Sequence, residues 1–82
     1  MKTIGKVRYI GRNIDLNSLE DGKIYRVVGF QEKLVRVIDG TGYAYLFSKS
    51  NPASLLHPEN NGRWEIVEDP LGELTKNMQL AK

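Results

Sequence analysis

The 82-residue sequence contains no cysteine and only one histidine, His57. Without cysteine the chain has no disulfide, no thiolate nucleophile and no sulfur ligands for zinc, and one histidine cannot form a histidine cluster. No apolar run approaches the roughly 20 residues of a membrane-spanning helix, and the first residues lack the apolar core of a signal peptide. We therefore expect a cytoplasmic protein with no metal site, no cofactor and no membrane as a partner.

The excess of positive over negative charge is also small. Twelve lysines and arginines against ten acidic residues leave a net charge of +2. Proteins that bind nucleic acids or membrane surfaces usually carry a much stronger positive charge. Nucleic acid is therefore not the expected partner.

The short length limits the chain to one small hydrophobic core. Folding of a chain this small buries only about 60 to 65% of the surface that the unfolded chain exposes. We expect one domain over residues 1–70, followed by a C-terminal tail over residues 71–82.

Five segments combine β-forming residues with the alternation of polar and apolar side chains that is typical of strands. Turn-forming glycine, asparagine and aspartate residues separate most of them. The strongest turn signal is Asp39-Gly40-Thr41-Gly42, which predicts a hairpin between the third and fourth strands. The predicted strands are residues 6–10, 23–30, 34–38, 43–47 and 63–68.

Five short strands in a small chain must close on themselves or leave long exposed edges that favour aggregation. The sequence therefore predicts an all-β fold, a small, strongly bent and partly open barrel. Gly29, Gly40 and Gly42 supply the bulge and turns that its curvature needs. The alternative, an oligonucleotide-binding barrel, usually has a helix between strands three and four, where this chain has a four-residue turn.

Two segments differ from the strands. Residues 48–62 form a long loop, in which Asn51 and Pro52 have the character of an N-cap and the first residue of one helical turn over residues 52–56. In the tail, Leu71, Leu74 and Met78 recur at helical spacing, which predicts a short C-terminal helix.

Four segments carry a resemblance: Asp21-Gly22-Lys23-Ile24-Tyr25, Val37-Ile38-Asp39, Tyr45-Leu46-Phe47 and Trp64-Glu65-Ile66-Val67-Glu68. In this order they resemble a set of short uncharacterised bacterial proteins with an SH3-like barrel. The resemblance covers about residues 6–70 and implies a five-stranded SH3-like barrel. No activity is assigned to that family, so the resemblance implies no functional residues. The loop between Phe47 and Arg63 and the tail after Pro70 depart from the pattern, and either is a place for a partner of this chain.

The sequence offers poor candidates for catalysis. His57 lies in the loop with no evident residue to orient it, and nucleophilic catalysis needs such a partner. The carboxylate pairs Asp15 with Glu20 and Glu65 with Asp69 occur in turns or at strand ends. Such positions are normally solvated, whereas a general acid needs a raised pKa and therefore an apolar pocket. We expect no enzyme activity.

Weak binding of single-stranded nucleic acid is the alternative function. Lys6 and Arg8 point to one face of the first strand. Together with Arg26 or Arg36 beside an exposed tyrosine, they could combine phosphate contacts with base stacking. A charged outer face that prevents an edge strand from pairing with other chains explains the same residues more simply.

The aromatic side chains are the main functional signal. One tryptophan, four tyrosines and two phenylalanines exceed what one small core requires. Tyr43, Tyr45 and Phe47 share one face of the fourth strand and Leu46 takes the other, so the aromatic face is either buried or an exposed patch. SH3-like barrels often present aromatic grooves to extended peptides. Tyr43, Tyr45 and Trp64 are therefore the candidate binding residues.

The apolar tail suggests a second mode of interaction. Leu71, Leu74 and Met78 are too many apolar side chains to leave in water. They either fold back over an open end of the barrel or pack on a second copy of the chain in a two-fold homodimer. The sequence thus predicts a non-enzymatic small barrel that acts as a protein-interaction or self-association module.

Overall fold

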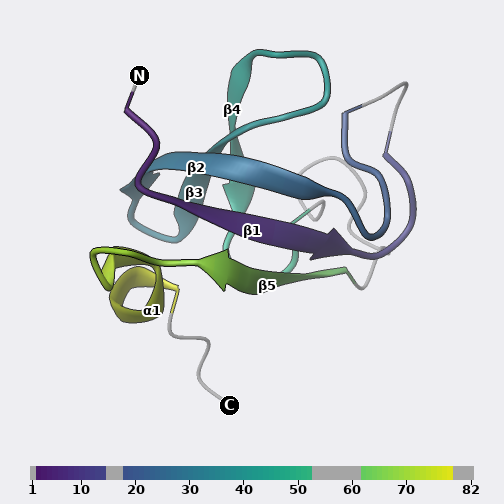
Figure 1. Ribbon diagram of the computed structural model, residues 1–82. Coiled ribbons are helices and arrows are strands. Elements are labelled where there is room, and N and C mark those ends of the chain that lie inside the picture. The colour runs from purple at the N-terminus through teal and green to yellow at the C-terminus, as the bar shows by residue number, and fades with distance from the viewer. Residues whose placement is uncertain (1, 15–17, 53–61, 79–82) are drawn as a thin grey trace.

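The computed structural model describes residues 2–14, 18–52 and 62–78. The strands form one antiparallel sheet in the order β4-β3-β2-β1-β5 (Figure 1). The sheet is not closed into a barrel, since β4 and β5 remain its two edges. The elements are β1 (Gly5–Ile10), β2 (Ile24–Gln31), β3 (Leu34–Ile38), β4 (Ala44–Ser48), β5 (Arg63–Glu68) and α1 (Glu73–Asn77).

This architecture confirms the mainly-β prediction. Each predicted strand boundary lies within one residue of the observed one. The helical turn predicted over residues 52–56 lies mostly outside the described residues. The described part of the chain has no helix with the length and apolar character that crossing a membrane requires.

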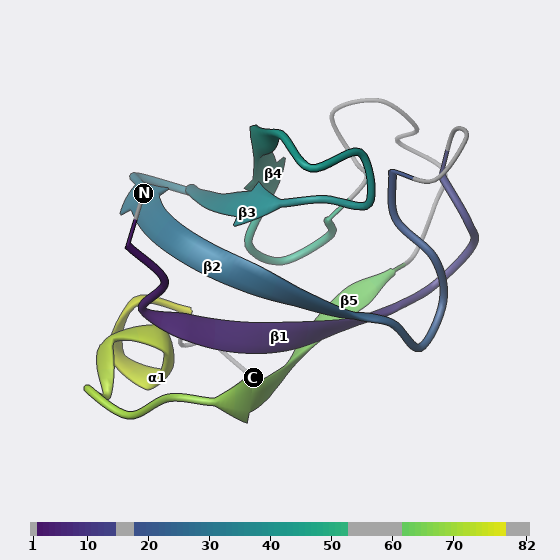
Figure 2. The same cartoon turned by 45° about the horizontal axis from the view of Figure 1, so that its top comes forward.

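The bend of the sheet is concentrated in β2. The first half of β2, residues 24–27, pairs with β1, whereas β3 pairs with residues 26–31, so Arg26 and Val27 pair with both strands. Between the two halves the register with β3 shifts at Val27 to Gly29, which is the position where the sequence predicts a bulge. One long strand therefore belongs to both halves of the curved sheet (Figure 2).

The predicted hairpin turn joins β3 to β4 and is stabilised by a buried carboxylate within the turn. The Asp39 carboxylate is buried and accepts hydrogen bonds from the Ser18 hydroxyl at 3.0 Å and the Thr41 N–H at 2.9 Å. Gly42 closes the turn with a φ of 91°, which an L side chain rarely adopts. The Gly40 N–H donates to the Ser18 carbonyl at 2.9 Å, so the hairpin is also tied to the connection between β1 and β2.

The core lies on the concave face of the sheet, where alternate residues of the strands point inward. Trp64 is at its centre. Its ring meets Tyr9 and Phe47 in edge-to-face geometry, with centroid separations of 5.8 and 6.1 Å. The buried core residues are Val7, Tyr9, Ile14, Leu19, Tyr25, Val27, Val35, Val37, Phe47, Trp64, Leu74 and Met78.

The predicted C-terminal helix is present and folds back onto the sheet. Helix α1 lies beside the start of β1 and the end of β5 (Figure 1 and Figure 2). Leu74 and Met78 belong to the core of this chain, whereas Leu71 is 65% exposed. Of the three tail residues considered for self-association, only Leu71 is therefore available to a second copy.

Asp69 fixes the start of α1. Its carboxylate accepts hydrogen bonds from the Leu74 N–H at 2.9 Å, the Thr75 N–H at 2.8 Å and the Thr75 hydroxyl at 2.7 Å. Desolvation acts to raise the pKa of Asp69, but these hydrogen bonds together outweigh it and hold the pKa below its ordinary value. An ionised carboxylate therefore accepts the N–H groups of the first turn, while Gly72 is the N-cap residue of the helix.

The close packing of α1 on β1 can be tested at Gly5. A Cβ at this position would lie 2.6 Å from Leu74 Cδ1 and 2.7 Å from the Glu68 carbonyl oxygen. We expect Gly5→Ala to lower the free energy of unfolding by about 1–3 kcal/mol, because the helix must shift to relieve the overlap. Urea denaturation followed by Trp64 fluorescence measures the change.

Gly29→Ala is the matched control, since nothing lies within 4 Å of a Cβ there. Its unfolding free energy should change by less than about 0.5 kcal/mol. Equal losses in the two variants would contradict the tight approach of α1 to β1.

Candidate functional site

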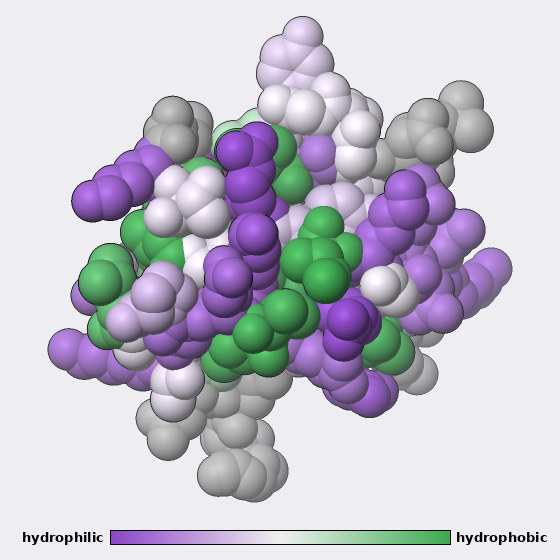
Figure 3. Space-filling model, viewed as in Figure 1, coloured by the Kyte–Doolittle hydropathy of each residue, from purple (hydrophilic) through white to green (hydrophobic). Residues whose placement is uncertain are grey.

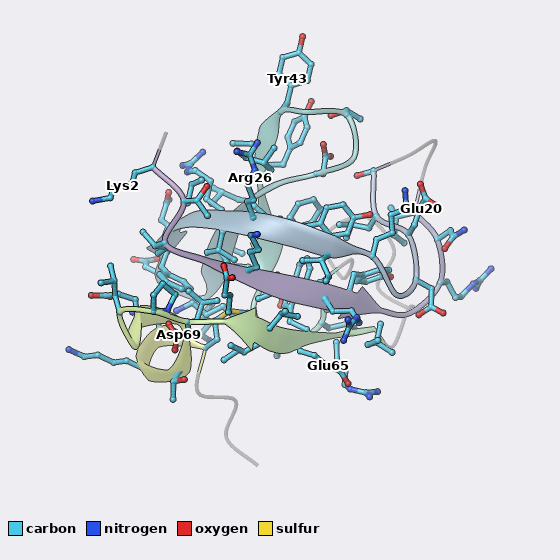
Figure 4. All side chains as sticks on the ribbon, viewed as in Figure 1. Lys2, Glu20, Arg26, Tyr43, Glu65 and Asp69 are labelled. Carbon is cyan, nitrogen blue, oxygen red and sulfur yellow. The ribbon has the colours of Figure 1, made fainter. Side chains whose placement is uncertain are left out.

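The two aromatic residues of β4, Tyr45 and Phe47, lie on the core side of the sheet, and Tyr43, just before the strand, continues the same face. Tyr45 pairs with Val37 and Phe47 with Val35, and both valines are buried. Exposure nevertheless rises steadily along this face, from 4% at Phe47 to 51% at Tyr45 and 68% at Tyr43. Figure 4 shows Tyr43 projecting from the start of β4, away from the rest of the sheet. The aromatic face thus begins in the core and continues into solvent.

Two main-chain hydrogen bonds define which residues of β4 bond to β3. The Asp39 N–H donates to the Tyr43 carbonyl at 3.0 Å, and the Lys49 N–H donates to the Lys33 carbonyl at 3.0 Å. In an antiparallel ladder, hydrogen-bonded pairs alternate with non-hydrogen-bonded pairs. The two hydrogen bonds, one before β4 and one after it, fit a single unbroken alternation of pairs. The pairing is therefore regular along the whole of β4.

It follows that Ala44, Leu46 and Ser48 direct their main-chain N–H and C=O groups away from β3. The Ser48 carbonyl already has a partner, because it accepts the Trp64 indole N–H at 3.0 Å. Within the described residues, no strand pairs with this side of β4. In the sheet that residues 2–14, 18–52 and 62–78 form, Ala44 and Leu46 therefore offer main-chain donors and acceptors at a free edge.

The two edges of the sheet differ in their protection against further pairing. Strand β5 carries charged side chains at Arg63, Glu65 and Glu68, which is a common device against pairing with other chains. Residues 43–47 contain no charge and no proline, and three of the five are aromatic. An exposed, uncharged edge of this kind is typical of a strand that pairs with something.

The basic residues of β1 are largely neutralised by β5. Lys6 Nζ lies 3.8 Å from Glu68 Oε1, and Arg8 Nη1 lies 3.6 Å from Glu65 Oε1. Figure 3 views this outer face and shows hydrophilic side chains across its middle with hydrophobic side chains between them. The predicted basic strand is thus half of a cross-strand ladder of ion pairs.

Arg26 and Arg36 also lie on the outer face. Arg26 pairs with Lys6 and Ile38, and Arg36 pairs with Leu46. Tyr45 belongs to the opposite face, so the sheet separates the basic side chains from the exposed aromatic rings. This arrangement does not combine phosphate contacts and base stacking on one surface.

Trp64 does not lie with Tyr43 and Tyr45 on the surface. It is 5% exposed and held between two other rings, so its faces are not accessible to a ligand. Of the three candidate binding residues, the structure brings only the two tyrosines together at the free edge.

The other two tyrosines belong to the core. The Tyr9 hydroxyl donates to the Arg12 carbonyl at 2.6 Å, and the Tyr25 hydroxyl accepts the Glu20 N–H at 2.8 Å. Burial raises the pKa of Tyr25 and outweighs the opposing effect of that hydrogen bond. Both hydroxyls therefore contribute to the fold.

The carboxylates considered for catalysis have structural partners where they are described. Glu65 is paired with Arg8, Asp69 accepts a hydrogen bond from the first turn of α1, and Glu20 lies 3.7 Å from Lys23 Nζ. His57 and Asp15 lie outside the described residues. Among the described residues, no three histidine, aspartate or glutamate side chains are grouped so as to hold a metal ion.

No family model, curated protein or solved structure matches this chain. The distinctive feature of the described surface is the β4 edge, which we define as the outward main-chain groups of Ala44 and Leu46 with the side chains of Tyr43 and Tyr45. Sequence reasoning identified the two tyrosines but missed Ala44 and Leu46. The alternation of hydrogen-bonded and non-hydrogen-bonded pairs along the hairpin identifies these two residues, but only once β4 is known to be an edge strand.

The contrast between exposed and buried aromatic residues predicts different effects on stability. Trp64→Phe should lower the free energy of unfolding by about 1–3 kcal/mol, because the half-buried Ser48 carbonyl loses its donor. Tyr43→Thr should change it by less than about 0.5 kcal/mol, because most of that side chain is in solvent. Urea denaturation followed by circular dichroism compares the two. A loss at Tyr43 as large as at Trp64 would mean that the exposed tyrosine is structural.

Proposed function

We propose that this protein is a non-enzymatic interaction module that binds an extended segment of a partner protein as a sixth strand at the β4 edge. The observation that carries the proposal is the set of outward main-chain groups at Ala44 and Leu46 on an uncharged edge. Addition of a strand to an exposed sheet edge is a common mode of peptide recognition.

The two parts of the β4 edge have different tasks in this proposal. Main-chain hydrogen bonds to Ala44 and Leu46 supply affinity that depends little on the sequence of the partner. Tyr43 and Tyr45 supply large, rigid apolar surfaces for alternate side chains of the added strand. Burial of these rings stabilises the complex and gives the module its selectivity.

The alternatives have less support. A homodimer through the tail loses much of its basis because Leu74 and Met78 are buried in the core of their own chain. Nucleic-acid binding is disfavoured because Lys6 and Arg8 are paired with acidic residues. The SH3-like classification remains part of the proposal, and the bent β2 and the return of β5 beside β1 are compatible with it.

Strand addition is tested by blocking the edge without disturbing the hairpin. Proline at residue 44 removes an N–H that points away from β3, a position where an edge strand tolerates proline. Peptides selected from a displayed library of random ten-residue sequences against the wild-type protein should bind Ala44→Pro at least about tenfold more weakly. Fluorescence anisotropy with labelled peptides measures both affinities.

Ala44→Ser is the control, since serine keeps the N–H and is similar in size. It should bind the selected peptides as the wild-type protein does. Near-ultraviolet circular dichroism of Trp64 establishes that both variants are folded. If a folded Ala44→Pro variant binds the peptides as tightly as Ala44→Ser, strand addition at β4 is wrong.

A further inference from the structure

Two arginines on the outer face lie behind the β4 edge. Arg36 of β3 is directly opposite Leu46, and Arg26 of β2 is opposite Ile38, the residue that pairs with Ala44. Among the described residues, neither arginine forms an ion pair. Strand β4 thus has no charge of its own, and the positive charge directly behind it has no acidic partner in the described part of the chain.

The distance from Arg36 to an added strand suits an ion pair. Neighbouring strands lie about 4.8 Å apart, so a strand added to β4 would run about 10 Å from β3. Arg36 and Leu46 form a non-hydrogen-bonded pair, in which side chains approach closely, and the guanidinium can extend over Leu46 toward the edge. A glutamate on the added strand, opposite Leu46, covers the remaining gap.

The opposite face of the same added strand would meet different chemistry. Its side chains alternate between the two faces, so the neighbours of each outer residue would pack beside Tyr45 and Tyr43. Those rings are uncharged and more than half exposed. Apolar residues fit this face, because they bury the rings without leaving a polar group unpaired.

The chain itself contains a strand of this kind. On the other side of the sheet, β5 places Glu65 and Glu68 beside Arg8 and Lys6 on the outer face. On the inner face, β5 places Trp64 in the core, opposite Tyr9. Strand β5 therefore places acidic residues on the outer face and an apolar residue on the inner face, beside β1.

We infer that the partner segment is an extended strand in which acidic residues, on the face of Arg36, alternate with apolar residues, on the face of Tyr45. This inference rests on the proposed strand addition and names the chemistry of its ligand. A second copy of this chain fits less well, because β4 has no acidic residue to place near Arg36 and each copy carries a net charge of +2. An acidic partner complements both features.

Three synthetic ten-residue peptides test the inference on the full-length protein. Each alternates valine with a second residue, which is glutamate, glutamine or lysine. We expect the glutamate peptide to bind about fivefold more tightly than the glutamine peptide and the lysine peptide to bind most weakly. Isothermal titration calorimetry gives the affinities, and amide hydrogen exchange at Ala44 and Leu46 reports whether a strand is added.

Arg36→Gln should remove the preference for glutamate over glutamine. Arg12→Gln makes the same change of charge at an exposed position outside the sheet and should leave the preference intact. A rise in salt from 0.05 to 0.5 M should weaken binding of the glutamate peptide more than that of the glutamine peptide. A preference for glutamate that survives in Arg36→Gln would overturn the role of Arg36.

The remaining outcomes separate this inference from the function on which it rests. Equal binding of all three peptides, with Ala44 and Leu46 protected, overturns the acidic partner but leaves strand addition standing. Protection of the same amides in the protein alone, with a mass that doubles at higher concentration, makes a second copy the occupant and also overturns the inference. If no peptide protects either amide, strand addition itself is contradicted.

Discussion

Trp64 connects the two edge strands of the sheet. Its ring packs between Tyr9 and Phe47 in the core, and its indole N–H donates to the Ser48 carbonyl at 3.0 Å. This hydrogen bond joins β5 to the last residue of β4, so the two edges of the sheet are held together at one end. At the other end of β4 no equivalent contact exists among the described residues. The fold is therefore a curved sheet whose two edge strands are connected at one end.

The features of the candidate site follow from this connection between the edge strands of the described sheet. Phe47 lies next to the Trp64 contact and is buried, whereas Tyr45 and Tyr43 lie progressively farther from it and become exposed. The pairing of the outward main-chain groups of β4 changes in the same direction. The Ser48 carbonyl accepts a hydrogen bond from Trp64, whereas Leu46 and Ala44 have no partner strand among the described residues. A sheet that closed along its whole length would bury these groups and have no interaction edge. The same fold that stabilises the core thus leaves β4 as an edge strand, which is the basis of the proposed strand addition.

Local sequence patterns predicted most of the strands and turns, because alternation, turn residues and bulges depend on neighbouring residues. The hairpin around Asp39, the bend at Gly29 and the helix around Leu74 are examples. The sequence did not reveal that Trp64 is buried, because its environment comes from residues distant in the chain. Parity placed Tyr43 and Tyr45 on one face, but their exposure depends on β4 being an edge. Strand order, which is a long-range property, separates the core aromatics from those of the candidate site.

Amide hydrogen exchange in the free protein tests the central claim most directly, since it reads the main chain of β4 residue by residue. The Tyr45 and Phe47 amides, which bond to β3, should be protected to a degree that approaches global stability. The Ala44 and Leu46 amides should exchange at least about a hundredfold faster than these neighbours, because their N–H groups face the free edge. Equal protection at all four residues would contradict the account, since it would mean that the outer side of β4 is already paired.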